Sequence, residues 1–473
     1  MDIDKVRQAL HGRWVARGEG GTISGVSIDT RTARAGELFV AIKGKTTDGH
    51  AFLAAAAAAG CKVAVIRTGT DLPPQLAEKF TGGLIAVDDT TTALGFLAGA
   101  CREETPATVI AVTGSNGKTT VKRMIHHILQ RRMKGSASPR SFNNEFGVPL
   151  TLLSVSPGDD YVVCEVGTNA PGEISRLAAI VRPDIAVITS VSPTHLEGLG
   201  SEDRVAVEKA ALLSGLQRDG MGVIWADSDK LARAVRAYDA KLVTFGESPG
   251  AQVRMSDWQR HGWGQRFKLN GRFDVELPLP GKHNAINALA AITVAQRLGF
   301  DAGAAGAALA DFVGEPGRLE RIEAGSVTVI NDAYNANPAS VLAAGDVLGG
   351  CEGPGRRVMV VGDMRELGDQ SDRLHKEVGD LLARKHIHLL VGVGALGRSI
   401  ARAAAEAGAP VEAFDTLAQA QKQLPALLQA GDVVLLKGSR AMALDKLVDT
   451  IRSAFAAEAT PATPAKKPTK GKR

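Results

Sequence analysis

Residues 108–129 constrain the fold more than any other stretch of the chain. Thr108-Val-Ile-Ala-Val-Thr113 is an apolar, β-branched run, and Gly114-Ser-Asn-Gly-Lys-Thr-Thr120 follows it directly. Beyond Lys118, apolar residues recur at helical spacing with basic residues between them. The pattern predicts a buried strand, a turn with two glycines and an amphipathic helix, which is typical of a parallel α/β sheet.

A loop of this kind predicts a phosphate site for ATP or GTP. Glycines let the backbone curl so that successive N–H groups point inward, and the helix N-terminus adds partial positive charge. A lysine can then reach the outer phosphates, while a threonine hydroxyl can bind Mg²⁺. The predicted cradle comprises Gly114, Ser115, Asn116, Gly117, Lys118, Thr119 and Thr120. It departs from G-x-x-x-x-G-K-[ST], because Val112 replaces the first glycine. The alternative is a strand–turn–helix that binds nothing.

The 473 residues read as three α/β blocks and a tail, which we place at 1–87, 88–314, 315–457 and 458–473. The central block contains further strand candidates at 160–168, 184–191, 220–229 and 241–246, mostly separated by helical stretches. Residues 251–280 alternate without a helix, so we expect antiparallel strands there, followed by a helix at 282–298. The third block resembles a second nucleotide-type (Rossmann-like) fold without a phosphate loop.

Composition excludes several classes of protein. The last fifteen residues carry five basic groups and no acidic ones, and without them the net charge of +5 falls to zero. The basic pI therefore does not indicate a nucleic-acid enzyme, and we expect the tail to be disordered. No apolar run is long enough to cross a membrane. The four cysteines lack a disulfide or metal spacing, which favours a cytoplasmic protein.

Two side chains at strand ends of the central block suggest metal chemistry, because ligands gather at the carboxyl ends of parallel strands. Glu165 ends the strand Tyr161-Val-Val-Cys-Glu and suits Mg²⁺, with a solvated glutamate as the alternative. His195 follows Pro193 in a glycine-rich loop after another strand, and we favour a metal or phosphate role over a structural one. Lys209 looks from sequence alone like a solvated lysine.

The third block also has polar strand ends. In residues 331–338, Asp332, Asn335 and Asn337 crowd beside Pro338, which can start a helix. Residues 362–368 and 437–442 again follow apolar strands. Three polar strand ends in one block suggest that this block faces a ligand.

These motifs occur in one order along nearly the whole chain before the tail, and that order resembles the Mur ligase family. The motifs are TGSNGKTT, SFNNEFGVPLT, CEVGTN, SPTHLEGLGS, GKHNAINALAA, GRLE, NDAYNANP, GDMRELG and LLKGSR. The N-terminal SIDTR and GELFVAIKGKTTDGHAF resemble the family's UDP-substrate domain. The resemblance implies three domains: a UDP-substrate domain, a central ATPase and a C-terminal dinucleotide-fold domain. NDAYNANP, GDMRELG and KGSR favour the member that joins D-alanyl-D-alanine to UDP-N-acetylmuramoyl-tripeptide.

The resemblance also implies a mechanism. ATP with Mg²⁺ phosphorylates the tripeptide carboxylate, and the amine of the dipeptide then attacks the acyl-phosphate to give an amide, ADP and phosphate. Cations are needed because two anions meet, and Mg²⁺ and Lys118 supply them.

The resemblance assigns a role to each candidate residue. Lys118 and Thr119 would hold phosphate and the first Mg²⁺, which Glu165 would share. His195 would bind a second Mg²⁺, and Lys209 matches a lysine that is carbamylated in relatives. The remaining roles are adenine contacts for His283, Asn284 and Asn287, a phosphate contact for Arg318, a ribose contact for Asp332, acceptor contacts for Asn143 and Asn144, and UDP-sugar contacts for Ser27, Asp29, Thr30 and Arg31. Tyr334 and Asn335 are further predicted substrate-binding residues.

Two other functions stay open at this point. A folylpolyglutamate synthase shares the core chemistry, but it lacks the UDP domain that residues 1–87 resemble. A non-catalytic nucleotide switch is the alternative from a different class, and Glu165, His195 and Lys209 argue against it. We expect a monomer with no nucleic-acid partner and no membrane insertion. The sequence leaves open whether the third residue of the tripeptide is diaminopimelate or lysine.

Overall fold

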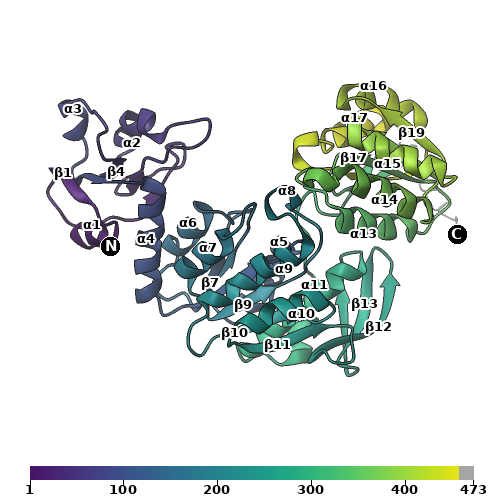
Figure 1. Cartoon of the computed structure of the whole chain (residues 1–473), viewed down its shortest axis with the longest axis horizontal. Helices are drawn as coiled ribbons and strands as arrows, with labels where there is room; N and C mark the ends of the chain where they lie inside the picture. The colour runs from purple at the N-terminus through teal and green to yellow at the C-terminus, as the bar shows by residue number, and fades with distance from the viewer. Residues whose placement is uncertain (457–473) are drawn as a thin grey trace, which may run out of the picture. The chain divides into compact units, whose positions relative to one another are not determined.

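The computed structural model describes residues 1–456, so the predicted tail at 458–473 lies outside the described part. The chain is α/β with three sheets, as predicted, and it divides into two compact units, Met1–Val313 and Gly314–Arg473 (Figure 1). The first unit contains two of the sheets and the second unit contains the third.

The first sheet has five strands in the order β1-β5-β4-β3-β2. Strand β1 is antiparallel to β5, and the other neighbours are parallel. Helix α4, Thr90–Glu104, leads out of this sheet and also packs on helices of the central one. The strands are β1 Arg13–Arg17, β2 Val26–Ser27, β3 Leu38–Val40, β4 Val63–Arg67 and β5 Gly83–Val87, and the helices are α1 Ile3–Ala9, α2 Leu53–Ala58 and α3 Pro74–Ala77.

The central sheet has nine strands in the order β14-β13-β12-β11-β10-β9-β6-β8-β7. Neighbours from β7 across to β12 are parallel, and β12, β13 and β14 are antiparallel to one another. The strands are β6 Thr108–Thr113, β7 Gly135–Ala137, β8 Tyr161–Glu165, β9 Ile185–Ile188, β10 Met221–Trp225, β11 Lys241–Gly246, β12 Val253–His261, β13 Gly264–Leu269 and β14 Phe273–Leu277. The helices are α5 Lys118–Leu129, α6 Gly147–Leu153, α7 Glu173–Val181, α8 Leu196–Leu199, α9 Glu202–Ala210, α10 Asp229–Ala234, α11 Lys282–Arg297 and α12 Ala302–Ala307.

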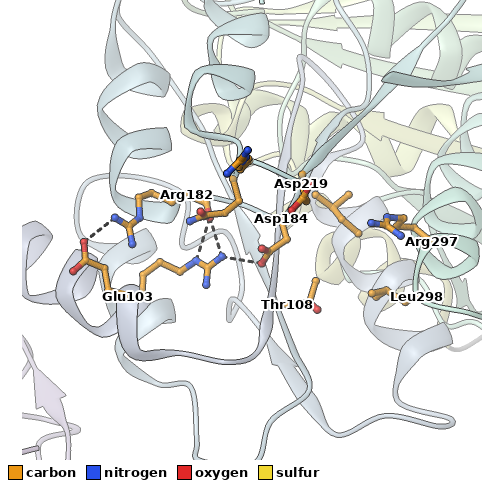
Figure 2. Close-up of a pocket in the computed structure, with 12 residues that line it drawn as sticks. Glu103, Thr108, Arg182, Asp184, Asp219, Arg297 and Leu298 are labelled. Carbon is orange, nitrogen blue, oxygen red and sulfur yellow. Dashed lines mark hydrogen bonds and ion pairs between the residues drawn. The ribbon is translucent and has the colours of Figure 1, made fainter. Parts of the chain in front are cut away.

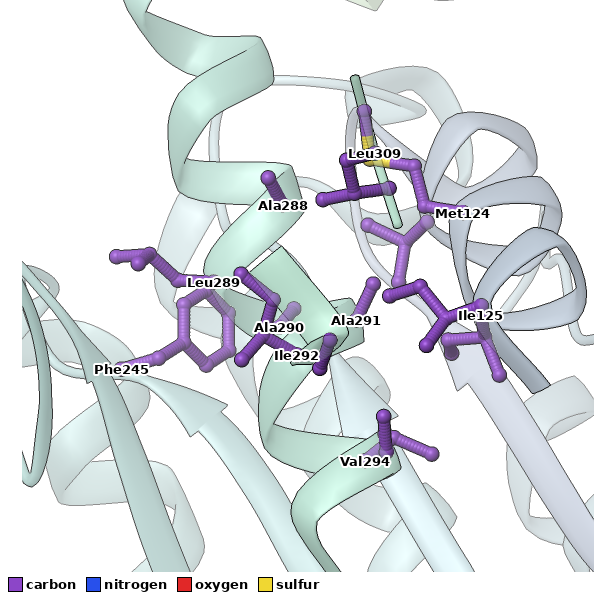
Figure 3. Packing of buried hydrophobic residues seen from close by; sticks show 14 of the residues in the cluster. Met124, Ile125, Phe245, Ala288, Leu289, Ala290, Ala291, Ile292, Val294 and Leu309 are labelled. Atoms are coloured by element: carbon purple, nitrogen blue, oxygen red, sulfur yellow. The ribbon is translucent and has the colours of Figure 1, made fainter. Parts of the chain in front are cut away.

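Helices α5 and α11 pack against each other, and this contact places the glycine loop. Figure 3 shows the small residues Ala290 and Ala291 of α11 between Ile125 of α5 and Phe245 of β11. All four side chains are fully buried. Small residues let two helices approach closely, so the N-termini of α5 and α11 come together beside the loop.

The third sheet has six strands in the order β15-β16-β20-β17-β18-β19, and only β15 is antiparallel to its neighbour. Helices cover it, and it has its own apolar core. The strands are β15 Glu320–Ala324, β16 Val327–Asn331, β17 Arg357–Gly362, β18 Leu389–Val393, β19 Val411–Phe414 and β20 Val433–Lys437. The helices are α13 Pro338–Gly349, α14 Ser371–Ala383, α15 Ala395–Glu406, α16 Leu417–Leu427 and α17 Lys446–Phe455.

The predicted elements around the glycine loop are confirmed. Strand β6 and the start of α5 have the predicted bounds, and 251–280 is antiparallel with α11 after it. Pro338 is the first residue of α13, as expected. Within residues 1–456, no helix combines the length and apolar character needed to span a bilayer.

Candidate active site

The glycine loop between β6 and α5 is tight, and its two glycines are required by contact as well as by backbone angle. Gly114 has φ +149°, and a Cβ there would lie 2.0 Å from Thr189 Oγ1. Gly117 has φ +81°, and a Cβ there would lie 2.3 Å from Asn287 Oδ1. Strand β6 runs to Thr113, so Val112 belongs to the strand and the loop begins only at Gly114.

The middle of the loop is fixed to the segment that follows β9. The N–H groups of Ser115 and Asn116 donate to the carbonyl and the hydroxyl of Ser190, each at 2.9 Å. Ser115 Oγ also donates to Ser192 O at 3.1 Å. These bonds hold the loop rigid and occupy two backbone donors, so the start of α5, where N–H groups lack intrahelical partners, is the part able to receive phosphate.

Lys118 and Thr119 form the first turn of α5. Lys118 Nζ donates to Gly114 O at 2.8 Å, which folds the lysine back over the loop. Thr119 is buried, and its hydroxyl donates to Glu165 Oε2 at 2.9 Å. Thr120 follows on the same turn and is half-buried. The Thr119–Glu165 hydrogen bond therefore links the first turn of α5 to the end of β8, the strand beside β6.

Glu165 is buried, with 1% of its surface exposed, so the alternative of a solvated glutamate is wrong. Asn143 Nδ2 donates to its Oε1 at 2.9 Å, and the Lys122 ammonium lies 3.2 Å from its Oε2. Asn144 instead closes the next turn, since its Oδ1 accepts from the N–H groups of Phe146 and Gly147.

The Thr119 hydroxyl and the Glu165 carboxylate fit one side of a magnesium site. Mg²⁺ prefers oxygen ligands and commonly takes one or two from protein, with water and phosphate completing the shell. Among residues 1–456 there is no cluster of three or more His, Cys, Asp or Glu side chains that would form a complete metal cage.

His195 lies in the segment after β9 and caps α8 in the left-handed region, with φ 53°. Lys209 lies near the end of α9 and is fully buried, so our sequence-based interpretation of a solvated lysine is wrong. Its Nζ has no hydrogen-bond partner within residues 1–456. Burial lowers the pKa of Lys209 well below its ordinary value, and the nearby charge of Lys118 lowers it further against the opposing effect of Glu208 and Glu173.

Helix α11 begins beside the loop with three candidate residues. Asn284 and Asn287 are buried, and Asn287 Nδ2 donates to Asn284 Oδ1 at 3.2 Å. Asn284 Nδ2 donates to Pro280 O at 2.8 Å. His283 is exposed on the first turn.

In the second unit, a buried lysine organises the carboxyl ends of β16 and β20. Lys437 Nζ lies 2.7 Å from Asp332 Oδ2 and donates to Asn335 O at 2.9 Å. The Arg318 guanidinium carbon lies 4.2 Å from the centre of the Tyr334 ring, a cation–π contact. Lys437 therefore links Asp332 to Asn335, and Arg318 lies on the ring of Tyr334.

The N-terminal candidates form a local turn after β2. Ser27 Oγ donates to Asp29 O at 3.1 Å, and the Arg31 side chain donates to both oxygens of the Asp29 carboxylate. These bonds lower the pKa of Asp29 to about 2. Thr30 lies between them and is half-buried.

A cavity of about 620 Å³ lies at the amino ends of the central parallel strands, opposite the carboxyl ends that carry the glycine loop and Glu165 (Figure 2). It is lined by Thr108 and Ile185, the first residues of β6 and β9, and by Gly220 just before β10. Its charged residues largely pair with one another, as in Arg102 with Asp184 at 2.8 Å and Arg182 with Glu103 at 2.7 Å. The cavity is therefore separate from the site around the glycine loop.

Comparison with known families decides the family. The Mur ligase middle domain matches residues 112–295, the Mur ligase glutamate ligase domain matches 317–440, and the Mur ligase family catalytic domain matches 22–100. A UDP-N-acetylmuramoyl-tripeptide–D-alanyl-D-alanine ligase of Bacillus subtilis is 36% identical, covering 91% of this chain and 94% of its own. The chain belongs to the Mur ligase family.

Other relatives also match more than nine tenths of this Mur ligase. The enzyme of the same name from Escherichia coli is also 36% identical, over 91% of this chain and 94% of its own. MurF from Acinetobacter baumannii superimposes with a TM-score of 0.85 at 31% identity, covering 95% of this chain and 98% of that one. MurF from Thermotoga maritima, solved in complex with ADP, gives a TM-score of 0.79 at 26% identity, covering 92% and 98%.

Sequence reasoning missed three buried charged residues of this Mur ligase. Lys122 contacts Glu165, Lys437 holds Asp332, and Glu208 accepts N–H bonds from Gly172 and Ile174. Lys122 lies one helical turn beyond Lys118, and Lys437 ends an apolar strand. Spacing and strand position are the only signals for them in the sequence, because their partners are distant in the chain.

Proposed function

We propose that this Mur ligase uses ATP to join D-alanyl-D-alanine to UDP-N-acetylmuramoyl-tripeptide in peptidoglycan precursor synthesis. The observation that carries the proposal is the buried Thr119–Glu165 pair beside the glycine loop, in a chain that matches ligases of that name along their length. The pair places a hydroxyl and a carboxylate at the phosphate end of a nucleotide loop, which suits phosphoryl transfer.

The reaction proceeds in two balanced steps. A carboxylate oxygen of the tripeptide attacks the γ-phosphorus, and the bond to ADP breaks. The dipeptide amine then attacks the acyl-phosphate carbon, and the amide forms as phosphate leaves and the amine loses a proton. Lys118 lowers the repulsion between the two anions in the first step.

Thr119 and Glu165 would hold one Mg²⁺, and His195 with Lys209 a second. Bound Mg²⁺ supplies charge neutralisation on the phosphates. Lys209 suits this role only as a carbamate, whose carboxylate is formed when its amine attacks carbon dioxide and releases a proton. A buried amine without a hydrogen-bond partner in residues 1–456 is suited to that reaction, since burial lowers its pKa well below the ordinary value and so favours the neutral, nucleophilic form.

The other assigned roles follow the resemblance and belong to this proposal. His283, Asn284 and Asn287 lie by the adenine, and Arg318 and Asp332 contact the phosphate and the ribose. Asn143 and Asn144 line the acceptor site, Tyr334 and Asn335 bind substrate, and Ser27, Asp29, Thr30 and Arg31 contact the UDP-sugar. The three domains are 1–87, 88–314 and 315–457, in a monomeric cytoplasmic enzyme.

Phosphate release tests the function directly. We expect release only when ATP, a UDP-tripeptide and D-alanyl-D-alanine are all present, and comparing lysine with diaminopimelate tripeptides identifies the third residue. Lys118→Ala should abolish release, while Lys422→Ala, at an exposed position on α16, should not. Phosphate release without the dipeptide, or without either tripeptide, would indicate a nucleotide switch instead.

A further inference from the structure

Lys122 has a position that the proposed chemistry does not use. It lies on α5 one turn beyond Lys118, yet only 2% of its surface is exposed. Its ammonium donates to the carbonyls of Ser138 (2.8 Å) and Arg140, and it lies 3.2 Å from Glu165 Oε2. These contacts supply one protein acceptor for each of the three N–H donors of an ammonium, so its hydrogen-bonding capacity is satisfied.

The carbonyls belong to the segment 138–144, which follows β7 and carries the acceptor candidates Asn143 and Asn144. Ser138 is bonded to β8 in two places, through Ser138 N to Val163 O (2.8 Å) and Glu165 N to Ser138 Oγ (3.1 Å). Arg140, by contrast, is exposed and has φ 45°, an unfavourable angle for a residue with a side chain. A strained residue keeps its conformation only when its surroundings hold it, and the bond to Lys122 is one such restraint.

The same segment reaches Glu165 from its other side. Asn143 Nδ2 donates to Oε1 of Glu165, while Thr119 and Lys122 of α5 approach Oε2. Asn143 O accepts from Gly167 N at 2.7 Å, and a Cβ on Gly167 would lie 2.9 Å from Asn143 Cγ. The acceptor segment and the nucleotide helix α5 therefore meet at one carboxylate, and Lys122 of α5 contacts both that carboxylate and the segment.

We propose that Lys122 is a positioning residue that holds the segment 138–144 in the conformation that binds the UDP-tripeptide. It acts through two backbone carbonyls and touches no substrate. The proposal rests on the proposed function for the identity of the acceptor, but the restraint on the segment is independent of it. Methionine at this position keeps the length and the apolar stem and removes all three donors.

Trypsin cleavage after Arg140 reports the restraint without any ligand. Arg140 is the only Lys or Arg between Lys134 and Arg176, so its product is identifiable by mass. We expect Lys122→Met to be cut there about tenfold faster than the unaltered protein, because cleavage follows the population of the open segment. Cleavage after Lys45, in an exposed segment of the first sheet, should not change and serves as the internal reference.

Lys122→Met leaves Glu165 buried without its cation, so the fold needs a separate control. The double variant Lys122→Met/Glu165→Gln removes both charges, and Glu165→Gln alone keeps the lysine. We expect fast cleavage after Arg140 in the double variant and slow cleavage in Glu165→Gln. Slow cleavage in the double variant, or equally fast cleavage in Glu165→Gln, would overturn the proposal.

Binding separates the positioning role from general support of the fold. We expect the dissociation constant for UDP-tripeptide, measured by calorimetry without nucleotide, to rise about tenfold in Lys122→Met, since a preorganised segment is lost. The dissociation constant for ADP measured without magnesium should change less than about threefold. Equal acceptor binding in the variant would refute this inference, whereas no acceptor binding by the unaltered protein would refute the proposed function.

Discussion

Three lysines near the glycine loop have the same side chain and different charge environments. Lys118 is half-buried over the loop, Lys122 is buried against a carboxylate, and Lys209 is buried without a hydrogen-bond partner among residues 1–456. A buried charge is tolerated only when it is paired, and otherwise the group loses its charge. Lys122 is paired with Glu165, whereas burial without a partner favours the neutral amine of Lys209, and this difference decides their chemistry.

Lys209→Ala should be nearly inactive and should keep its fold. Acetate or another small carboxylate should partly restore ligation by replacing the carbamate, and methylamine should not. Adding acetate to Lys118→Ala, which lacks a cation, should restore nothing and is the matched control. Phosphate release measures all three. Rescue of Lys209→Ala by the amine alone, or full activity without rescue, would contradict the carbamate.

Gly117→Ala should cost more stability than its backbone angle explains. Gly20 has nearly the same φ, +77°, but nothing lies within 4 Å of a Cβ built there, whereas Gly117 faces Asn287. The left-handed angle alone costs about 1–2 kcal/mol for a residue with a side chain, so Gly20→Ala should lose about 1 kcal/mol and Gly117→Ala about 2–4 kcal/mol. Denaturant unfolding measures the loss in free energy of unfolding for each variant. Equal losses for Gly20→Ala and Gly117→Ala would show that Asn287 moves aside freely.

At the scale of elements, the sequence predicted the interior of the sheets better than their edges. Strands β6 and β11 have the predicted bounds, because apolar and β-branched runs stand out between glycine turns. Edge strands β7 and β19 were not predicted, and neither was β15. Each of these strands has at most one buried residue, such as Phe414 in Val411-Glu-Ala-Phe414, so little apolar pattern marks them. The buried lysines could not be predicted either, because burial depends on residues distant in the chain.

The loop 362–368 shows how a polar strand end can be structural. Asp363 Oδ1 accepts from Leu396 and Gly397 at the start of α15, and Met364 N donates to the buried His375 at 2.9 Å. The other ring nitrogen of His375 bonds Ser371 O at 2.7 Å, which requires the neutral tautomer. This loop was one of three polar strand ends that suggested a ligand-facing block, and two of its residues bond α14 and α15.

The stability of this loop should decrease as the pH is lowered. Burial lowers the pKa of His375 below its ordinary value of 6.5, against opposing effects of the Ser371 carbonyl, Asp363 and Asp372. The contribution of the neutral histidine is therefore complete above about pH 6.5 and is lost as pH falls toward the lower folded pKa. Amide exchange of Met364, corrected for its intrinsic pH dependence, should speed up over that range. His375→Gln accepts the same bond without titrating, so an identical pH dependence in that variant would contradict the assignment.

For the whole molecule, the division at Val313 and Gly314 separates complete sheets with separate cores. Within the first unit, α4 belongs to two environments. Its Ala93, Leu94 and Leu97 join the core of the first sheet, while the same helix packs on α6 and α7 of the central one. The sequence predicted three blocks from their patterns, but it carries no signal that two of them share a helix and form one compact unit.

Cutting the chain between Val313 and Gly314 should therefore yield two folded pieces. Each piece keeps every strand of its sheets, and no sheet edge is newly exposed, because β14 and β15 lie in separate sheets. Piece 1–313 keeps the glycine loop, Thr119 and Glu165, so we expect it to bind ADP. Ligation also needs the roles that we propose for Arg318 and Asp332, so we expect no ligation from this piece. Calorimetry of each piece should show a cooperative transition, and a piece 314–473 without one would mean that its core needs the first unit.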